Sequence, residues 1–232
     1  KSNPADENNR IPMEARALLL KAKDPNTKHK NILIDTGNGS DFIAKYGEKL
    51  GSQFKDMYTL DENGPNLISS LKVHGLEPHD ITDVILTHLH FDHAGGATCA
   101  IPNTNELAPT FPKAMYYVQK SNLETAQHPN RRERASYFAA NFEPLMTAGQ
   151  LTLIDGDTKN ILPNISVVVS NGHTQGHQSV VIEDTDKKLI YCGDVIPTSS
   201  HVRSAWIMGY DLNALMLIEE KSKLLNLSLE KP

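Results

Sequence analysis

The sequence has few cysteines, no excess of basic residues and no long apolar run, and each shortage excludes a class of protein. Cys99 and Cys192 are too few for a disulfide framework. We interpret both as small buried thiols, with zinc ligation as the alternative. No apolar stretch approaches the ~20 residues that a membrane-spanning helix needs, so we expect no membrane partner.

The charge balance argues against nucleic acid as a partner. The 23 basic residues are outnumbered by 28 acidic ones, giving a net charge of -5, whereas nucleic-acid binding favours a basic excess. We interpret the one dense basic cluster, residues 131–134, as a solvated helix face. The first residues lack the apolar core of a signal peptide, which favours a cytoplasmic location. Because the chain begins without methionine, a removed signal peptide is the alternative.

The order of patterns along the chain predicts an α/β fold. Apolar residues make up 39% of the chain and charged residues 22%, which is ordinary for a globular domain with a substantial core. Alternating or β-branched runs predict strands at 15–21, 31–34, 81–86, 114–119, 151–155, 165–170, 179–183 and 188–192. Helical patterns cover parts of 41–58, 65–74, 120–148 (broken at Pro129 and Pro144) and 211–226, whose apolar face is predicted as Leu212, Leu215, Met216 and Ile218. Residues 97–112 are predicted to be a loop. No linker divides the sequence, so residues 1–232 are predicted to form one domain of mixed sheets covered by helices.

The densest chemical signal is Thr87-His88-Leu89-His90-Phe91-Asp92-His93-Ala94-Gly95-Gly96, directly after the predicted strand at 81–86. Imidazoles at i and i+2 can converge on one cation, while Asp92 and His93 can hold a second. This mixture of nitrogen and carboxylate ligands suits zinc best, with iron, manganese and cobalt as alternatives. We expect Gly95 and Gly96 to let the backbone turn sharply away beneath the ligands.

Two more predicted strands end in metal-capable residues beside glycine. His173 and His177 follow the strand at 165–170, and Asp194 follows the strand at 188–192. Because loops at one edge of a sheet can converge, we expect these residues to complete the site. A Gly-rich turn at Asp35-Thr36-Gly37 follows a further strand. Asp35 is either a buried carboxylate behind the ligands or a turn residue, and His177 is either a support for a ligand or a surface histidine.

Taken together, these residues resemble a known family. The pattern His88-x-His90-x-Asp92-His93, then Gly-His173-x-x-Gly-His, then Gly-Asp194 resembles the metallo-β-lactamase-fold metallohydrolases over about residues 15–220. That resemblance implies an αββα sandwich, two mixed β-sheets flanked by helices, with a dinuclear site. It implies one metal on His88, His90 and His173, a second on Asp92 and His93, and Asp194 as the bridge between them.

The resemblance also implies hydrolysis by a metal-bridging hydroxide, with Asp92 as the catalytic residue that orients it and passes on its proton. Two divalent ions, best fitted by zinc, would be the cofactors. The stretches 193–198 and 206–211 look most like the lactonase and organophosphate-hydrolase branch. A lactone or other ester is therefore the expected small-molecule substrate, with a phosphotriester or a thioester as alternatives. A non-catalytic metal-binding module is the hypothesis from another class.

Two expectations concern parts of the site that the motif leaves open. The family usually adds a last histidine to the second metal, and counting from Asp194 places it just past Pro232. Most members of the family also open with strands before the segment that begins here, so we expect that residues 1–232 lack both native ends. Phe91, His201, Trp206 and Tyr210 are the predicted substrate-pocket residues, with a role in the core as the alternative. A homodimer is one interpretation of the assembly.

Overall fold

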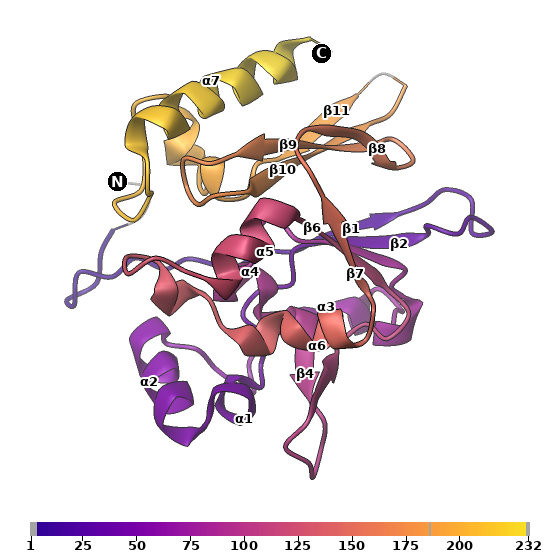
Figure 1. The fold of residues 1–232 in the computed structure, drawn as a ribbon, viewed down its shortest axis with the longest axis vertical. Coiled ribbons are helices and arrows are strands. Elements are labelled where there is room, and N and C mark those ends of the chain that lie inside the picture. Colours follow the sequence, from indigo (N-terminus) through magenta and orange to yellow (C-terminus); the bar gives the residue numbers. More distant parts are fainter. Residues whose placement is uncertain (1–3, 186, 231–232) are drawn as a thin grey trace.

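Two β-sheets pack face to face in the structure, a computed structural model that describes residues 4–185 and 187–230 (Figure 1). The first sheet has the order β1 (Leu18–Lys21), β2 (Asn31–Ile34), β3 (Asp83–Ile85), β6 (Met115–Gln119) and β7 (Leu151–Ile154). Only the β1–β2 pair is antiparallel, so this sheet is mixed as predicted. The second sheet was also predicted to be mixed, but it is antiparallel throughout: its order is β11 (Lys188–Tyr191), β10 (His177–Glu183), β9 (Ile165–Ser170) and β8 (Thr158–Leu162).

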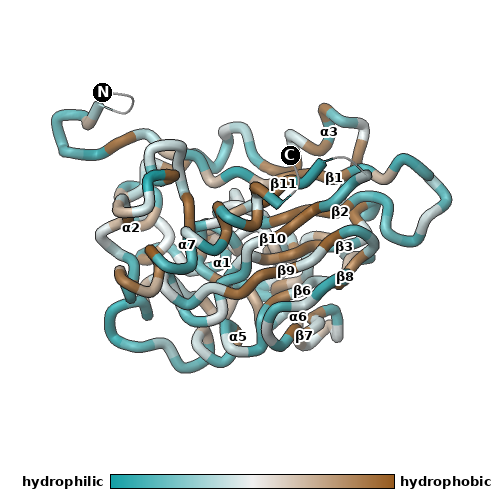
Figure 2. The backbone as a smooth tube through the Cα atoms, turned by 90° about the horizontal axis from the view of Figure 1, so that it is seen from above, coloured by the Kyte–Doolittle hydropathy of each residue, from teal (hydrophilic) through white to brown (hydrophobic). Residues whose placement is uncertain are grey.

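Side chains that alternate along the first sheet separate two apolar layers. Ile32, Ile34 and Ile85 face the second sheet, where they pack with Ile165, Val167 and Val180. Leu33 and Val84, one residue out of step, face the other way. There they pack against residues of α3 (Leu67–Val73), α5 (Lys120–Gln127) and α6 (Glu143–Thr147). The strands of both sheets accordingly form the hydrophobic centre of Figure 2.

The helix α7 (Ala214–Leu229) covers the outer face of the second sheet, which completes an αββα sandwich. Its predicted apolar face is wrong. Leu215 and Met216 are exposed, and the buried positions are Leu217, Lys221 and Leu224. The apolar run at 214–218 surrounds the helix and cannot define a face. The buried stripe also contains a lysine, because Lys221 Nζ donates to the carbonyl of Trp206.

Several short elements differ from the predictions. The segment predicted as a loop at 97–112 contains the hairpin β4 (Thr98–Ala100) and β5 (Leu107–Pro109), and β8 was not predicted. Pro144 lies in the first turn of α6, where its missing N–H is not needed, rather than breaking a longer helix. The basic cluster at 131–134 is turn and 3₁₀ backbone, not a helix face, and its Glu133 is buried.

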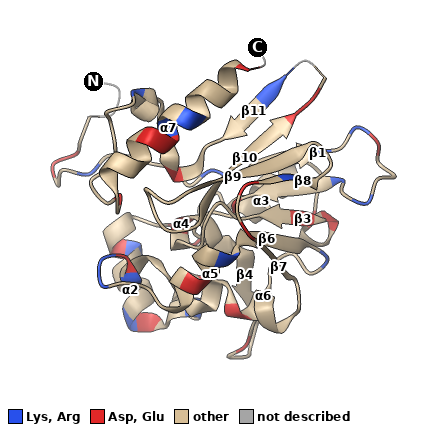
Figure 3. Cartoon of the chain, turned by 45° about the horizontal axis from the view of Figure 1, so that its top comes forward, with Lys and Arg blue, Asp and Glu red and all other residues tan. Residues whose placement is uncertain are grey.

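The remaining elements are α1 (Phe42–Tyr46), α2 (Glu48–Tyr58), α4 (Phe91–Ala94) and short 3₁₀ turns, among them η5 (Gly193–Val195). Acidic and basic residues are interspersed on α2 and α7 (Figure 3). Among the helices of the described ranges, none is long and apolar enough to cross a membrane. The loops after β2, β3, β9 and β11 carry Asp35, the histidine cluster, His173 and Asp194. The contacts described below show that these loops meet at one edge of the sandwich.

Candidate metal centre

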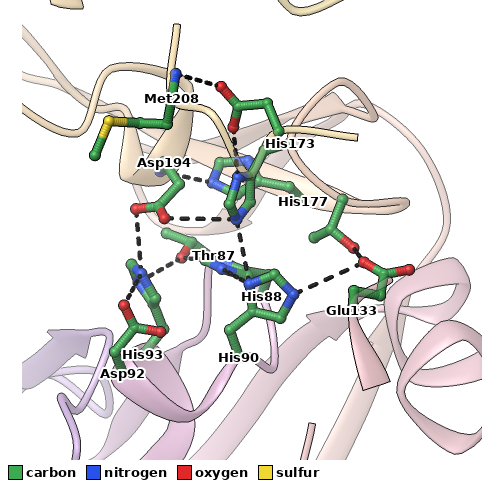
Figure 4. Close-up of polar contacts among 12 residues, drawn as sticks. Thr87, His88, His90, Asp92, His93, Glu133, His173, His177, Asp194 and Met208 are labelled. Carbon is green, nitrogen blue, oxygen red and sulfur yellow. Dashed lines mark hydrogen bonds and ion pairs between the residues drawn. The ribbon is translucent and has the colours of Figure 1, made fainter. Parts of the chain in front are cut away.

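Three imidazole nitrogens converge at the end of β3. His88 Nε2 lies 3.0 Å from His90 Nδ1, and His173 Nε2 lies 3.2 Å from the same atom. All three residues are buried (Figure 4). Nitrogens bonded to one tetrahedral zinc ion at 2.0–2.1 Å are about 3.3 Å apart, so these donors fit zinc with little movement.

A second group of potential ligands adjoins the first, formed by His93 and Asp194 together with His88. Asp194 Oδ1 lies 3.2 Å from His93 Nε2, while Asp194 Oδ2 lies 3.5 Å from His173 Nε2. One carboxylate thus directs an oxygen to each group, which is the geometry of a bridge (Figure 4). Asp92 Oδ2 is 3.6 Å from His93 Nε2, and its side chain, 40% exposed, is more open to solvent than that of His93 or Asp194.

The charges of the cluster divide its histidines into two kinds. Burial lowers the pKa of His88 far below its ordinary value, and the neighbouring imidazoles lower it further. Burial also acts against His93, but the carboxylates of Asp194, Asp92 and Asp35 outweigh it and raise the pKa of His93 well above its usual range. Three carboxylates thus favour positive charge beside His93, and a divalent cation could supply that charge.

The ring nitrogens that face away from the centre are held by polar partners. His93 Nδ1 lies 2.8 Å from Asp35 Oδ2, and His88 Nδ1 lies 3.0 Å from Thr87 Oγ1, which itself donates to Asp35 at 2.9 Å. His173 Nδ1 lies 2.8 Å from the buried carboxylate of Asp211. Such partners fix the tautomer and the orientation of a metal-binding imidazole.

Asp35 lies behind the ligands, as one of its two interpretations predicted. Its φ of +59° is a left-handed conformation that an aspartate tolerates. His177 is fully buried rather than on the surface, but it does not orient another imidazole. Its Nε2 accepts the backbone N–H of Asp194 at 3.1 Å and its Nδ1 pairs with Ser170 Oγ at 2.8 Å. His177 therefore fixes the turn that presents Asp194.

Gly95 and Gly96 are needed for a different reason from the predicted sharp turn. Gly95 has ordinary right-handed helical angles, φ -59° and ψ -36°. A Cβ on Gly95 would lie 2.3 Å from the carbonyl oxygen of Asn38, and one on Gly96 would lie 2.4 Å from that of Thr36. The turn after β2 thus packs directly against the ligand loop, and only glycine allows this approach.

Lys45 of α1 supports the same loop from below. Its ammonium donates to the carbonyls of Gly95 and Thr98, the latter at 3.2 Å. Burial lowers the pKa of Lys45 to about 8, which Asp41 and Cys99 only partly oppose. The charged amine therefore carries a desolvation cost at neutral pH.

We expect Lys45→Met to flatten the pH dependence of stability in alkaline solution. Between pH 8 and the unfolded-state pKa near 10.5 the unfolded chain binds more protons, so the free energy of unfolding rises with pH. Relative to that of the variant, the free energy of unfolding of the wild type should rise by about 1.4 kcal/mol per pH unit, which is roughly 3 kcal/mol between pH 8 and 10.5. Urea unfolding of metal-free protein from pH 8 to 10 measures this. Exposed Lys49→Met is the control, and parallel slopes for Lys45→Met and the wild type would contradict the prediction.

The four predicted pocket residues lie in different surroundings. Tyr210 lies beside the centre, with its ring 5.8 Å from that of His173; burial, followed by the charges of Asp194 and Asp92, raises its pKa. Phe91 is buried against Phe54, at 4.4 Å between ring centres. His201 and Trp206 make side-chain contacts within their own segment, His201 with Thr198 and Trp206 with Arg203. Neither belongs to either ligand group in the described residues.

Some residues of the site were not predicted. Asp211, whose carboxylate lies 2.8 Å from His173 Nδ1, belongs to the stretch 206–211. That stretch had been used only to relate the chain to the lactonase and organophosphate-hydrolase branch. Glu133 lies 3.8 Å from His90 Nε2, inside the cluster interpreted as a solvated face. Burial acts to raise the pKa of Glu133, but interactions with His90 and Thr174 outweigh it and lower that pKa. Thr87, which contacts both Asp35 and His88, was given no role either; its position directly before the first histidine is the signal that could have identified it.

A sequence profile of the metallo-beta-lactamase superfamily matches residues 19–230, which is most of the chain. The chain belongs to the metallo-beta-lactamase superfamily. Both the predicted family and the predicted αββα fold are therefore confirmed. Within this superfamily fold, the chain carries a cluster of histidines that could hold a metal ion.

Similar proteins within the metallo-beta-lactamase superfamily include lactonases. The chain is 31% identical to an N-acyl homoserine lactonase from a Bacillus species over 159 residues, 68% of this chain and 55% of that protein. It thus spans little more than half the length of this relative. A probable metal-dependent hydrolase from Staphylococcus aureus superposes with a TM-score of 0.81 at 27% identity, covering 97% of this chain and 73% of that one. AidC, a dizinc quorum-quenching lactonase in complex with the product N-hexanoyl-L-homoserine, has a TM-score of 0.65 at 24% identity, covering 91% and 67%.

Proposed function

We propose that this protein is a dinuclear zinc hydrolase that opens a lactone or cleaves a related ester. The observation that carries the proposal is the position of Asp194, whose two oxygens face two adjacent groups of ligands. His88, His90 and His173 would hold one ion, and His93 and Asp92 the other. The lactonase names of the Bacillus relative and of AidC support the substrate class.

When bound, two zinc ions would lower the pKa of a bound water to about 7 and polarise the substrate carbonyl. The chain itself supplies orientation and proton transfer. Asp92 lies at the more exposed side of the centre, where a carboxylate can accept a proton from the attacking water and return it to the leaving oxygen. We assign to Tyr210, whose ring centre lies 5.8 Å from that of His173, the donation of a hydrogen bond to the substrate.

The surroundings of the centre support a partly apolar substrate. Phe91 packs with Phe54 and with Tyr58, whose ring centre is 5.0 Å away. Tyr58 is half-exposed. Its pKa is raised first by the partial burial of its hydroxyl and second by the negative charge of Asp92. Tyr58, the exposed member of this aromatic group, thus lies near Asp92, where the acyl part of an ester could lie. Roles for His201 and Trp206 in the pocket, a homodimer and a cytoplasmic location stay predictions.

A panel of substrates on the zinc-loaded protein tests the proposal. An acyl lactone, a phosphotriester and a thioester should be compared at equal concentration, with the lactone expected to give the highest kcat/KM. His88→Ala is the control, since it removes an inward nitrogen of the first group and should abolish the turnover. Preference for the phosphotriester or the thioester would move the enzyme to that class. Zinc binding without turnover on any substrate would favour the non-catalytic module.

A further inference from the structure

Glu133 is a buried carboxylate that neither the ligand motif nor the family accounts for. It is 5% exposed, and it belongs to the segment between α5 and the 3₁₀ turn η3 (Arg134–Ser136). Asn130 holds it in place, with its Nδ2 donating to Glu133 Oε1 at 2.6 Å. A carboxylate removed from water in this way requires partners that favour its charge.

The second oxygen of Glu133 faces the metal centre. Thr174 Oγ1 donates to Oε2 at 2.6 Å, and His90 Nε2 lies 3.8 Å from the same oxygen (Figure 4). His90 Nε2 is buried and makes no hydrogen bond with any residue in the described ranges. Because Nδ1 of His90 points to His88 and His173, the proton of the ring belongs on Nε2, on the side of Glu133.

A chain of hydrogen bonds extends from this carboxylate to both ligand loops. Thr174, which follows His173, pairs with the hydroxyl of Tyr137 at 2.8 Å. Asn122 Nδ2 donates to that hydroxyl at 3.3 Å, and its Oδ1 accepts the backbone N–H of Leu89 at 2.8 Å. Leu89 lies between His88 and His90. The network therefore connects the loop after β3 to the loop after β9 behind the imidazoles.

We propose that Glu133 is a positioning residue that receives the Nε2–H of His90 and so directs His90 Nδ1 at the first metal. His93 and His173 have carboxylate partners in Asp35 and Asp211, and Glu133 supplies the corresponding partner for His90. The inference rests on the proposed function, because it assumes that His90 is a zinc ligand. It assigns a role to a residue of this chain that lies 43 positions beyond that ligand in the sequence.

Zinc affinity tests the role, because removing such a partner from a ligand histidine costs 10–100-fold in affinity. In competition with a chromogenic chelator, Glu133→Ala should bind the tighter zinc up to ~100-fold more weakly, and Glu133→Gln, which keeps an acceptor oxygen but loses the charge, ~10-fold more weakly. The visible spectrum of the cobalt-substituted Glu133→Gln protein should also change. The cobalt spectrum reports the ligand field directly, which a purely structural role would leave unchanged.

Asp83→Asn is the matched control. Asp83 is also a buried carboxylate paired with a histidine, His29 at 2.9 Å, and it lies in β3 away from the ligand loop. This variant should lose stability but retain the zinc affinity of the wild type. If Glu133→Gln binds zinc within twofold of the wild type, with the same cobalt spectrum, the role is overturned even if Glu133→Ala does not fold. A wild-type protein that binds no zinc would instead overturn the proposed function.

Discussion

Asp92→Asn should reduce turnover of the zinc-loaded enzyme by roughly 10²–10⁴-fold, the usual scale of general acid–base assistance. The substitution keeps the size of the side chain and one oxygen donor, but removes the charge and the ability to accept a proton. Asp92 lies 3.6 Å from His93 Nε2 and is 40% exposed, so it can reach both the ligands and a substrate. Steady-state kinetics at saturating zinc, with metal content measured in parallel, gives the result.

The leaving group separates proton transfer from metal binding by Asp92. A nitrophenyl ester releases nitrophenolate, which needs no proton to leave. Asp92→Asn should therefore slow the hydrolysis of a nitrophenyl ester much less than that of an alkyl ester or a lactone. Asp56→Asn, an exposed carboxylate of α2, controls for the change in net charge and should leave kcat unaltered. Equal losses for good and poor leaving groups at full zinc occupancy would leave Asp92 as a ligand only.

Asp194→Ala should remove both ions, because its two oxygens lie within 3.5 Å of His93 and His173 on opposite sides. We expect zinc affinity to fall by at least ~100-fold, beyond the range that partners of ligand histidines contribute. The metal-free variant should also show a lower pKa for His93. Burial already acts to lower that pKa, and Asp194 is the largest of the charges that oppose burial.

Metal analysis after gel filtration and titration of the His93 imidazole signals by NMR measure these two effects. Asp157→Ala is a suitable control, since Asp157 is an exposed carboxylate that pairs with Lys223 away from the centre. If Asp194→Ala retained two zinc ions per chain, Asp194 would not be the bridge. An unchanged pKa of His93 would mean that Asp35 and Asp92 alone keep its proton.

The candidate ligands could be identified from the sequence because they follow apolar strands within a few residues, and the structure brings their donor atoms together. His88, His90 and His93 come directly after β3, and His173 and Asp194 follow β9 and β11 in the same way. Strand ends that share an edge bring such loops together, so local patterns were enough. Except for β8, the strands of the two sheets were predicted because their apolar residues form short runs that are continuous in the sequence.

Two supporting residues, Asp211 and Glu133, were not predicted, because their contacts join distant segments. Asp211 reaches His173 across 38 positions, and Glu133 reaches Thr174 across 41. Glu133 also lies among arginines, so its local pattern indicates a solvated surface. Lys221 shows the same limit in α7, because a lysine on the buried stripe is satisfied only by carbonyls of the 203–206 segment. Periodicity cannot detect partners of this kind.

The two sheets also divide the chain in a simple way. Every strand of the first sheet lies before Asp155, and every strand of the second sheet, with α7, lies after Gly156. The centre thus sits on the seam between two consecutive halves of one polypeptide, with His88, His90 and His93 from one half and His173 and Asp194 from the other. Ion binding and the docking of these halves would therefore be reciprocally linked: a bound ion would strengthen docking by the same free energy by which docking strengthens ion binding.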